Sequence, residues 1–112
     1  MPTRETTAAF ILDQLGHPDR FSVRSMFGEF ALYAEGKVVG LICDDHLYVK
    51  ILPESTVLER TCDHAAPFPG AKDYYLVPES MITGDRSLAE LLCRMALALP
   101  YPKAKKPKRS KG

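Results

Sequence analysis

The pattern of hydrophobic and polar positions between residues 24 and 50 predicts short β-strands joined by tight turns. Residues 38–43 form an apolar run rich in β-branched side chains, which is typical of a strand covered on at least one face. Residues 47–51 then alternate apolar and polar, as in a strand with one buried face. Polar breaks at 34–37 and 44–46 suit tight turns. We expect the rest of the chain to cover this meander.

The first strand of the meander is predicted to begin near Phe21 or Val23 and to continue through Gly28 to about residue 34. A glycine inside a strand pattern predicts a bulge or the close approach of another element. Beyond it the apolar side chains alternate, so that one face carries Phe30, Leu32 and Ala34. The opposite face carries Ala31 and Tyr33.

Two amphipathic helices flank this meander in the sequence. Helical spacing of apolar residues predicts the first helix over residues 4–15, capped by Thr3, and its apolar stripe is Ala8, Ile11, Leu12 and Leu15. The second is predicted to begin at Ser87 and to end before Pro100, and its stripe is Leu88, Leu91, Leu92, Met95 and Leu99. Both stripes are wide enough to pack against a sheet.

The segment between these helices contains several shorter predicted elements. Pro53 is expected to open a short helix over residues 54–61, with Val57 and Leu58 as its main apolar contacts. Residues 63–72 contain two prolines and a glycine, which predicts a loop without a regular element.

A further strand is predicted over residues 73–77, and a turn-rich segment follows it to Asp85. The expected fold is α+β. It consists of an antiparallel sheet, made of the three-stranded meander and at least one later strand, flanked by N-terminal and C-terminal helices.

Length and composition place the chain among single-domain cytoplasmic proteins. Its 112 residues suffice for one core. No apolar run approaches the roughly 20 residues of a membrane span, and the N-terminus does not have the pattern of a secretory signal. The three cysteines have no CxxC spacing, which is typical of reduced thiols.

The charges are distributed unevenly along the chain. Residues 1–102 contain nine basic and 14 acidic residues, a net charge of −5, and residues 103–112 add +6. We therefore divide the chain into a folded domain, residues 1–102, and a basic tail that we expect to be disordered. The cations of the tail are Lys103, Lys105, Lys106, Lys108, Arg109 and Lys111.

Two blocks of residues resemble a known family. The first block is an Arg-x-Met-Phe-Gly start, a tyrosine-ended strand, a glycine turn and an Asp-x-x-Leu-Tyr pattern: Arg24, Met26, Phe27, Gly28, Tyr33, Gly36, Asp44 or Asp45, Leu47, Tyr48 and Lys50. The second block is Tyr74, Tyr75, Val77 and Pro78. With these blocks, over roughly residues 5–99, the chain resembles the N-terminal domain of the TfoX/Sxy family.

The resemblance implies an architecture shared with secretion-chaperone-like and YjbR-like domains, which often bind other proteins. It also implies a regulator of natural DNA competence that acts with a cyclic-AMP-responsive transcription factor. The full-length regulators carry a second, helical C-terminal domain, and we expect this chain to lack it. The resemblance therefore supports an interaction module more directly than it supports the competence role itself.

The family signature at Arg24, Met26, Phe27 and Gly28 has two interpretations. As a binding edge, it would use the guanidinium of Arg24 to hold a carboxylate or phosphate. As a structural feature, Met26 and Phe27 would pack in the core, Gly28 would form a bulge, and Arg24 would pair with Asp44 or Asp45.

Tyr33, Tyr48, Tyr74 and Lys50 are predicted to share one sheet face. Such an aromatic and basic face could stack the bases of single-stranded nucleic acid. Tyrosines are also common on half-buried strands, and the charge of −5 on residues 1–102 repels phosphate. The ordinary structural interpretation is preferred.

The cysteines and histidines do not form a recognisable metal or catalytic motif. Cys62 and His64 lie close together, with Cys43 and His46 elsewhere, but paired zinc spacings are absent. Residues two apart seldom form a nucleophile–base pair. We therefore predict no metal, no cofactor and no catalysis.

The resulting functional hypothesis is a non-catalytic regulatory module that binds a protein, by family resemblance a component of the transcription machinery. A homodimer through an exposed strand edge is compatible with it. The basic tail is interpreted either as a weak nonspecific tether to nucleic acid or an acidic partner, or as a solvated tail. The alternative is a nucleic-acid-binding protein that uses the tail and the tyrosine face.

Overall fold

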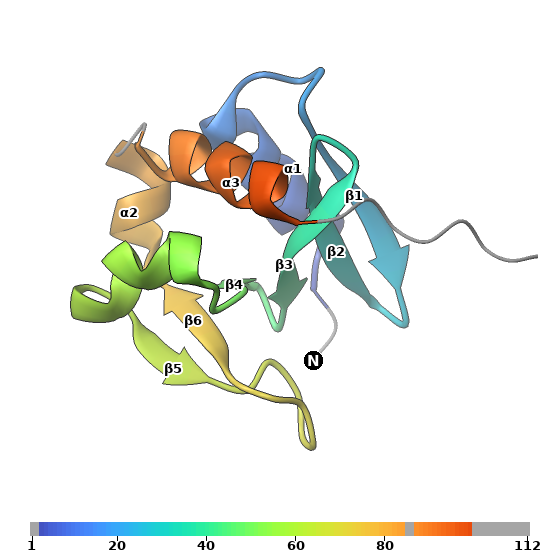
Figure 1. The fold of residues 1–112 in the computed structure, drawn as a ribbon. Helices are drawn as coiled ribbons and strands as arrows, with labels where there is room; N and C mark the ends of the chain where they lie inside the picture. Colours follow the sequence, from blue (N-terminus) through green and yellow to red (C-terminus); the bar gives the residue numbers. More distant parts are fainter. Residues whose placement is uncertain (1–2, 85–86, 100–112) are drawn as a thin grey trace, which may run out of the picture.

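The computed structural model describes residues 3–84 and 87–99 of the 112-residue chain (Figure 1). The elements follow in the order α1 (Glu5–Leu15), β1 (Phe21–Met26), β2 (Glu29–Ala34), β3 (Lys37–Cys43), β4 (His46–Val49), the 3₁₀ helix η1 (Pro53–Arg60), β5 (Asp63–Ala65), β6 (Tyr74–Val77), α2 (Glu79–Gly84) and α3 (Ser87–Ala98). None of the described helices is long and apolar enough to cross a membrane.

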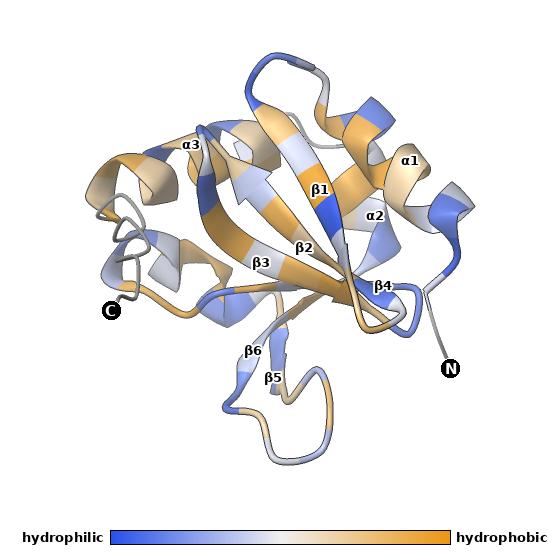
Figure 2. Ribbon diagram, turned by 90° about the vertical axis from the view of Figure 1, so that its right-hand side faces the viewer, coloured by the Kyte–Doolittle hydropathy of each residue, from blue (hydrophilic) through white to orange (hydrophobic). Residues whose placement is uncertain are grey.

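The described strands form one antiparallel sheet in the order β1-β2-β3-β4-β6-β5. Figures 1 and 2 show the helices gathered on one face of this sheet, while the β5–β6 hairpin extends away from them. The predicted α+β class, with an antiparallel sheet flanked by N-terminal and C-terminal helices, is confirmed. The helices leave the opposite face, which we call the outer face, without a helical layer.

The main core lies between the helices and the inner face of the sheet. Its largest fully buried side chains include Ile11, Leu32, Ile42, Leu47, Tyr75, Leu88, Leu92 and Met95. Both predicted helical stripes are confirmed, because their members are buried or pack against this core. Within η1, Leu58 is buried as predicted, but the prediction for Val57 is wrong, because that side chain is exposed to solvent.

Two-residue turns with positive φ at both positions close the first three hairpins: Phe27-Gly28, Glu35-Gly36 and Asp44-Asp45. This is the geometry of type I′ turns, whose twist matches that of the paired strands. The two turns predicted from polar breaks are confirmed. The continuous strand predicted through Gly28 is wrong, because β1 ends at Met26 and the chain returns from Glu29 as β2. A phenylalanine in place of the usual Asn or Asp conceals this turn in the sequence.

The sheet irregularity occurs in β2 and β3 instead of at Gly28. The register shifts between Leu32 and Tyr33, which pair with Gly40 and Val38. A Cβ at Gly40 would lie 2.3 Å from the carbonyl oxygen of Tyr48, so the close approach of β3 and β4 requires glycine.

Two short elements replace the irregular structure expected after residue 62. β5 lies within the predicted loop and pairs with β6. The prolines of that loop, Pro67 and Pro69, come after β5, so they leave its hydrogen bonds intact. α2 occupies the segment predicted to be turn-rich and begins directly after Pro78. The basic tail lies outside the described residues.

Candidate functional site

The β1–β2 turn holds a large aromatic side chain in water. Phe27 is fully exposed, at 101% of its reference area, and has a φ of 53°. For a bulky residue this left-handed backbone is strained, and only glycine adopts it freely. The structural interpretation that placed Phe27 in the core is therefore wrong. The exposed ring buries no surface against the rest of the protein, so no packing offsets the backbone strain.

Glu29 fastens this turn to the N-terminal segment. Its carboxylate oxygen Oε1 accepts hydrogen bonds from the backbone N–H and the hydroxyl of Thr3 and from the backbone N–H of Asp44. Burial alone would raise the pKa of Glu29, but these hydrogen bonds outweigh it and lower the pKa below its ordinary value. The N–H of Thr3 also donates to the carbonyl oxygen of Gly28. The hydrogen bonds of Thr3 to Gly28 and Glu29 thus fix the position of the turn that carries Phe27.

Asp45 caps α1 from the β3–β4 turn. Its Oδ1 accepts the N–H of Arg4 at 3.0 Å and the hydroxyl of Thr7 at 2.8 Å, and its Oδ2 lies 3.3 Å from Nε of Arg4. These bonds, led by that of the Arg4 N–H, lower the pKa of Asp45. The prediction that Thr3 caps the helix is wrong, because Arg4 is the N-cap residue. Thr3 is buried, and its hydroxyl oxygen accepts the N–H of Asp45.

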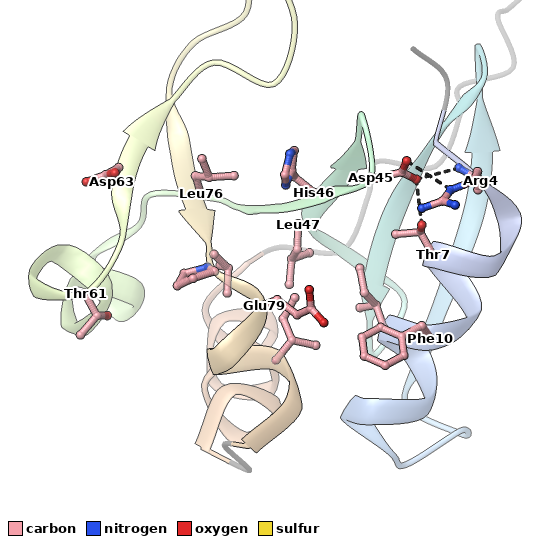
Figure 3. Close-up of a pocket in the computed structure, with 14 residues that line it drawn as sticks. Arg4, Thr7, Phe10, Asp45, His46, Leu47, Thr61, Asp63, Leu76 and Glu79 are labelled. Atoms are coloured by element: carbon pink, nitrogen blue, oxygen red, sulfur yellow. Dashed lines mark hydrogen bonds and ion pairs between the residues drawn. The ribbon is translucent and has the colours of Figure 1, made fainter.

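A groove of about 570 Å³ opens beside this cap, between α1 and α2 (Figure 3). It crosses the end of the sheet where β4 begins and β6 ends. Its apolar lining is Phe10, Ile11, Leu47, Leu76, Val77, Pro78 and Ile82. Most of these side chains belong to the main core or pack beside it, so the groove has a firm apolar floor.

Acidic side chains dominate the rim of the groove. On the α1 side the Arg4–Asp45 ion pair balances its own charge. Figure 3 shows Glu79 of α2 in the middle of the groove and Asp63 of β5 on the opposite side. Both are exposed, so the groove offers a surplus of negative charge around an apolar floor.

The turn, the cap and the groove are contiguous. Thr3 contacts Gly28 in the β1–β2 turn, and the next residue, Arg4, lines the groove. We call this region, made of Phe27, the Arg4–Asp45 pair and the groove, the α1 end.

The three tyrosines that were predicted to share one sheet face lie together on the outer face. Tyr48 and Tyr74 form a second apolar cluster with Ala31, Leu41 and Cys43, and Tyr33 packs against it. The prediction that the three tyrosines share one face is confirmed. Only 7% of Tyr48 and 9% of Tyr74 is exposed. Burial is the main reason that the pKa of each of these two tyrosines is raised. Their rings therefore offer little surface for stacking.

Arg24 contacts a tyrosine of this face, and Lys50 interacts with Lys72. The guanidinium carbon of Arg24 is 5.9 Å from the ring centroid of Tyr33, which is a cation–π contact. Burial, and then the neighbouring Lys72, lower the pKa of Lys50. Met26 packs partly buried against the same cluster, as its structural interpretation expected.

Cys62 and His64 have separate contacts, and Cys43 pairs with His46 across the β3–β4 hairpin. Sγ of Cys62 is 3.7 Å from Sδ of Met81, whereas Nε2 of His64 is 3.0 Å from a carboxylate oxygen of Glu59. Cys43 is buried on the outer face, and burial raises its pKa to about 11. Over residues 3–84 and 87–99 no three His, Cys, Asp or Glu side chains gather as a metal-binding group.

Sequence reasoning missed the groove because its residues come from four separate segments. One signal was available: Phe10 lies off the apolar stripe of α1 and is 39% exposed. A large aromatic side chain on the polar side of an amphipathic helix indicates a second contact surface. Glu79 gave no signal, since it lay in a segment predicted to be irregular.

Fold and site together define a small α+β domain with an exposed aromatic turn and an acidic apolar groove at one end. The family model of the TfoX N-terminal domain matches residues 13–98, and the chain belongs to this family. It is also 39% identical over 108 residues to an uncharacterised 12.7 kDa protein in the trpE 5′ region of Spirochaeta aurantia. That match covers 96% of this chain and 93% of the relative.

Proposed function

We propose that this chain is a non-catalytic regulatory module that acts by binding another protein through its α1 end. The observation that carries the proposal is Phe27, which is fully exposed in a strained backbone conformation. When no contact inside the fold offsets the strain of such a conformation, a functional role for the residue can be inferred.

The energetics of protein interfaces support this assignment. Burying a phenylalanine side chain contributes about 2–3 kcal/mol, and aromatic and arginine side chains dominate binding hot spots. Phe27 and Arg24 are both exposed on the same hairpin. A partner that covers Phe27 and Arg24 would gain more binding free energy than one that covers a turn of polar residues.

The family supports a proposal for the kind of partner. TfoX-type regulators act with a cyclic-AMP-responsive transcription factor, so the partner proposed for this module is a protein of the transcription machinery. The tail, with its six cations, would add weak electrostatic attachment to nucleic acid or to an acidic surface.

Direct nucleic-acid binding is the second candidate. The observations that favour it are the contact of Arg24 with Tyr33 on the outer face and the mutual proximity of Lys50 and Lys72. The burial of Tyr48 and Tyr74 counts against it, because base stacking needs an open ring face.

A capture experiment tests the first candidate. Immobilised full-length chain is compared with Phe27→Ser and with Leu97→Ser, a matched control whose side chain is 79% exposed on α3. We expect a specific set of proteins to be retained by the wild type and the control and lost by Phe27→Ser. Equal retention by all three would refute the use of the α1 end.

Fluorescence anisotropy with DNA and RNA at low and moderate salt tests the second. A variant with its six tail cations replaced by serine is compared with a Lys50→Ala, Lys72→Ala variant. Salt-sensitive binding that is lost with the tail makes the tail a tether. Binding that is lost only with the lysine pair would place Lys50 and Lys72 in the binding site.

A further inference from the structure

We infer that Phe27 of one copy inserts into the groove of a second copy, so that the chain forms a two-fold homodimer through its α1 end. This inference rests on the proposed function, since it assigns the same surface a second occupant, another copy of the chain, which would compete with the protein partner. It differs from strand-edge pairing because the contacts come from side chains at the ends of the hairpins.

The groove defines what its occupant must carry. Its floor is apolar, and a volume of about 570 Å³ exceeds that of one aromatic side chain. Glu79 and Asp63 on the rim favour a cation beside the inserted group. The complementary ligand is therefore a protruding aromatic side chain accompanied by Lys or Arg.

The β1–β2 hairpin of this chain has that chemistry. Phe27 protrudes completely into solvent from the tip. Arg24, three residues earlier on β1, is exposed and supplies the cation. Over the described residues, Val57 and Leu97 are also strongly exposed but lie on η1 and α3. Phe68, in the connection between β5 and β6, is 49% exposed, about half as much as Phe27.

The placement of the two features permits a closed pair. The Phe27 side chain and the groove lie at the same end of the molecule, separated by the start of α1. There Thr3 contacts Gly28, and Arg4 lines the groove. A two-fold axis near this point lets each copy insert its Phe27 into the other. Both contacts then form at once, and neither copy leaves an unfilled groove.

Sedimentation equilibrium of the full-length chain gives the first test. We expect a dimer whose dissociation constant rises about 100-fold or more in Phe27→Ser, because two aromatic anchors are lost, and is unchanged in Leu97→Ser. A monomeric wild type at the highest concentration reached would overturn the inference. So would a dimer that survives Phe27→Ser, since this would indicate strand-edge pairing.

Site-specific crosslinking gives the second test. The variant Phe27→p-benzoyl-phenylalanine is mixed in unlabelled and ¹⁵N-labelled forms and irradiated. We expect crosslinked peptides of mixed label that join position 27 to the groove at Phe10, Glu79 or Ile82. Mixed-label crosslinks to β1, or none at all, would contradict the inference.

The two proposals fail in different ways. If the wild type is monomeric but Phe27→Ser loses captured proteins, the α1 end binds a different protein and only the homodimer is wrong. If Phe27→Ser changes neither association nor capture, the proposed function is wrong as well.

Discussion

Two hairpin turns at the α1 end have the same backbone geometry but use their side chains differently. Phe27 has a φ of 53°, and Asp45 has a φ of 61°. The carboxylate of Asp45 binds the first turn of α1, so its strained backbone positions a group that the fold needs. Phe27 points into solvent and contributes no comparable contact. Backbone strain that is offset by contacts inside the fold indicates a structural role. Backbone strain that no internal contact offsets indicates a surface that binds a partner.

The third turn of this type agrees with the comparison. Glu35 has a φ of 53° in the β2–β3 turn, and its carboxylate lies 3.5 Å from Nε of Arg20. The two acidic turns thus have internal partners, and the phenylalanine turn does not bury its side chain. This difference leads to predictions of opposite sign for the turns.

The largest effect is expected from Glu29→Ala, which breaks the link between the two turns. The substitution leaves the N–H groups of Thr3 and Asp44 without their carboxylate acceptor. Loss of these charge-assisted bonds lowers the free energy of unfolding by about 2 kcal/mol. Urea denaturation followed by circular dichroism measures this change.

Glu35→Ala is the matched control for that substitution. It removes an exposed ion pair with Arg20, which contributes about 0.5 kcal/mol or less. If the two variants are equally stable, Glu29 does not fasten the turns, and the internal compensation described for this end is wrong.

A smaller effect with the opposite sign is expected from Phe27→Asn. Asn-Gly is the preferred pair for a type I′ turn, so the free energy of unfolding rises by about 1 kcal/mol. The same substitution removes the aromatic anchor, and we expect capture and dimerisation to be lost. Thermal denaturation at a concentration at which the wild type is monomeric measures the stability, and sedimentation at higher concentration measures the dimerisation.

That combination of results distinguishes function from architecture. A gain in stability with loss of association identifies Phe27 as a residue retained for binding at the expense of stability. At a concentration at which the wild type is monomeric, a loss of stability would show instead that the ring has a contact within its own chain, and the comparison between the two turns would fail.

The sequence was sufficient to predict the elements that depend on hydrophobic periodicity. The stripes of α1 and α3 and the apolar run of β3 require only local spacing. The β1–β2 turn was missed because its first residue is not one that type I′ turns prefer. The helix cap was missed because its acceptor, Asp45, lies 41 residues along the chain from Arg4.

The candidate site was predictable only in part, for a related reason. The signature at positions 24–28 and the shared tyrosine face were visible as local patterns. Whether a side chain in such a pattern is buried depends on its neighbours in the sheet. Tyr48 is buried in β4 between β3 and β6, whereas Phe27 is exposed in a turn between two strands. The groove joins α1, β4, β6 and α2, and no local pattern specifies how these segments meet.

The smallest effect is expected from pH, and it separates the two turns again. Glu29 and Asp45 have pKa values below their ordinary values of 4.5 and 3.8 in the folded chain. The unfolded chain therefore binds protons more readily, so their contribution to stability is complete above these ordinary values and is lost as the pH falls below them. We expect the melting temperature to decrease on acidification from about pH 5 to pH 3. The decrease should be shallower in the double variant Glu29→Gln, Asp45→Asn and the same as in the wild type in Phe27→Asn. Equal slopes in the wild type and both variants would show that these carboxylates do not stabilise the α1 end.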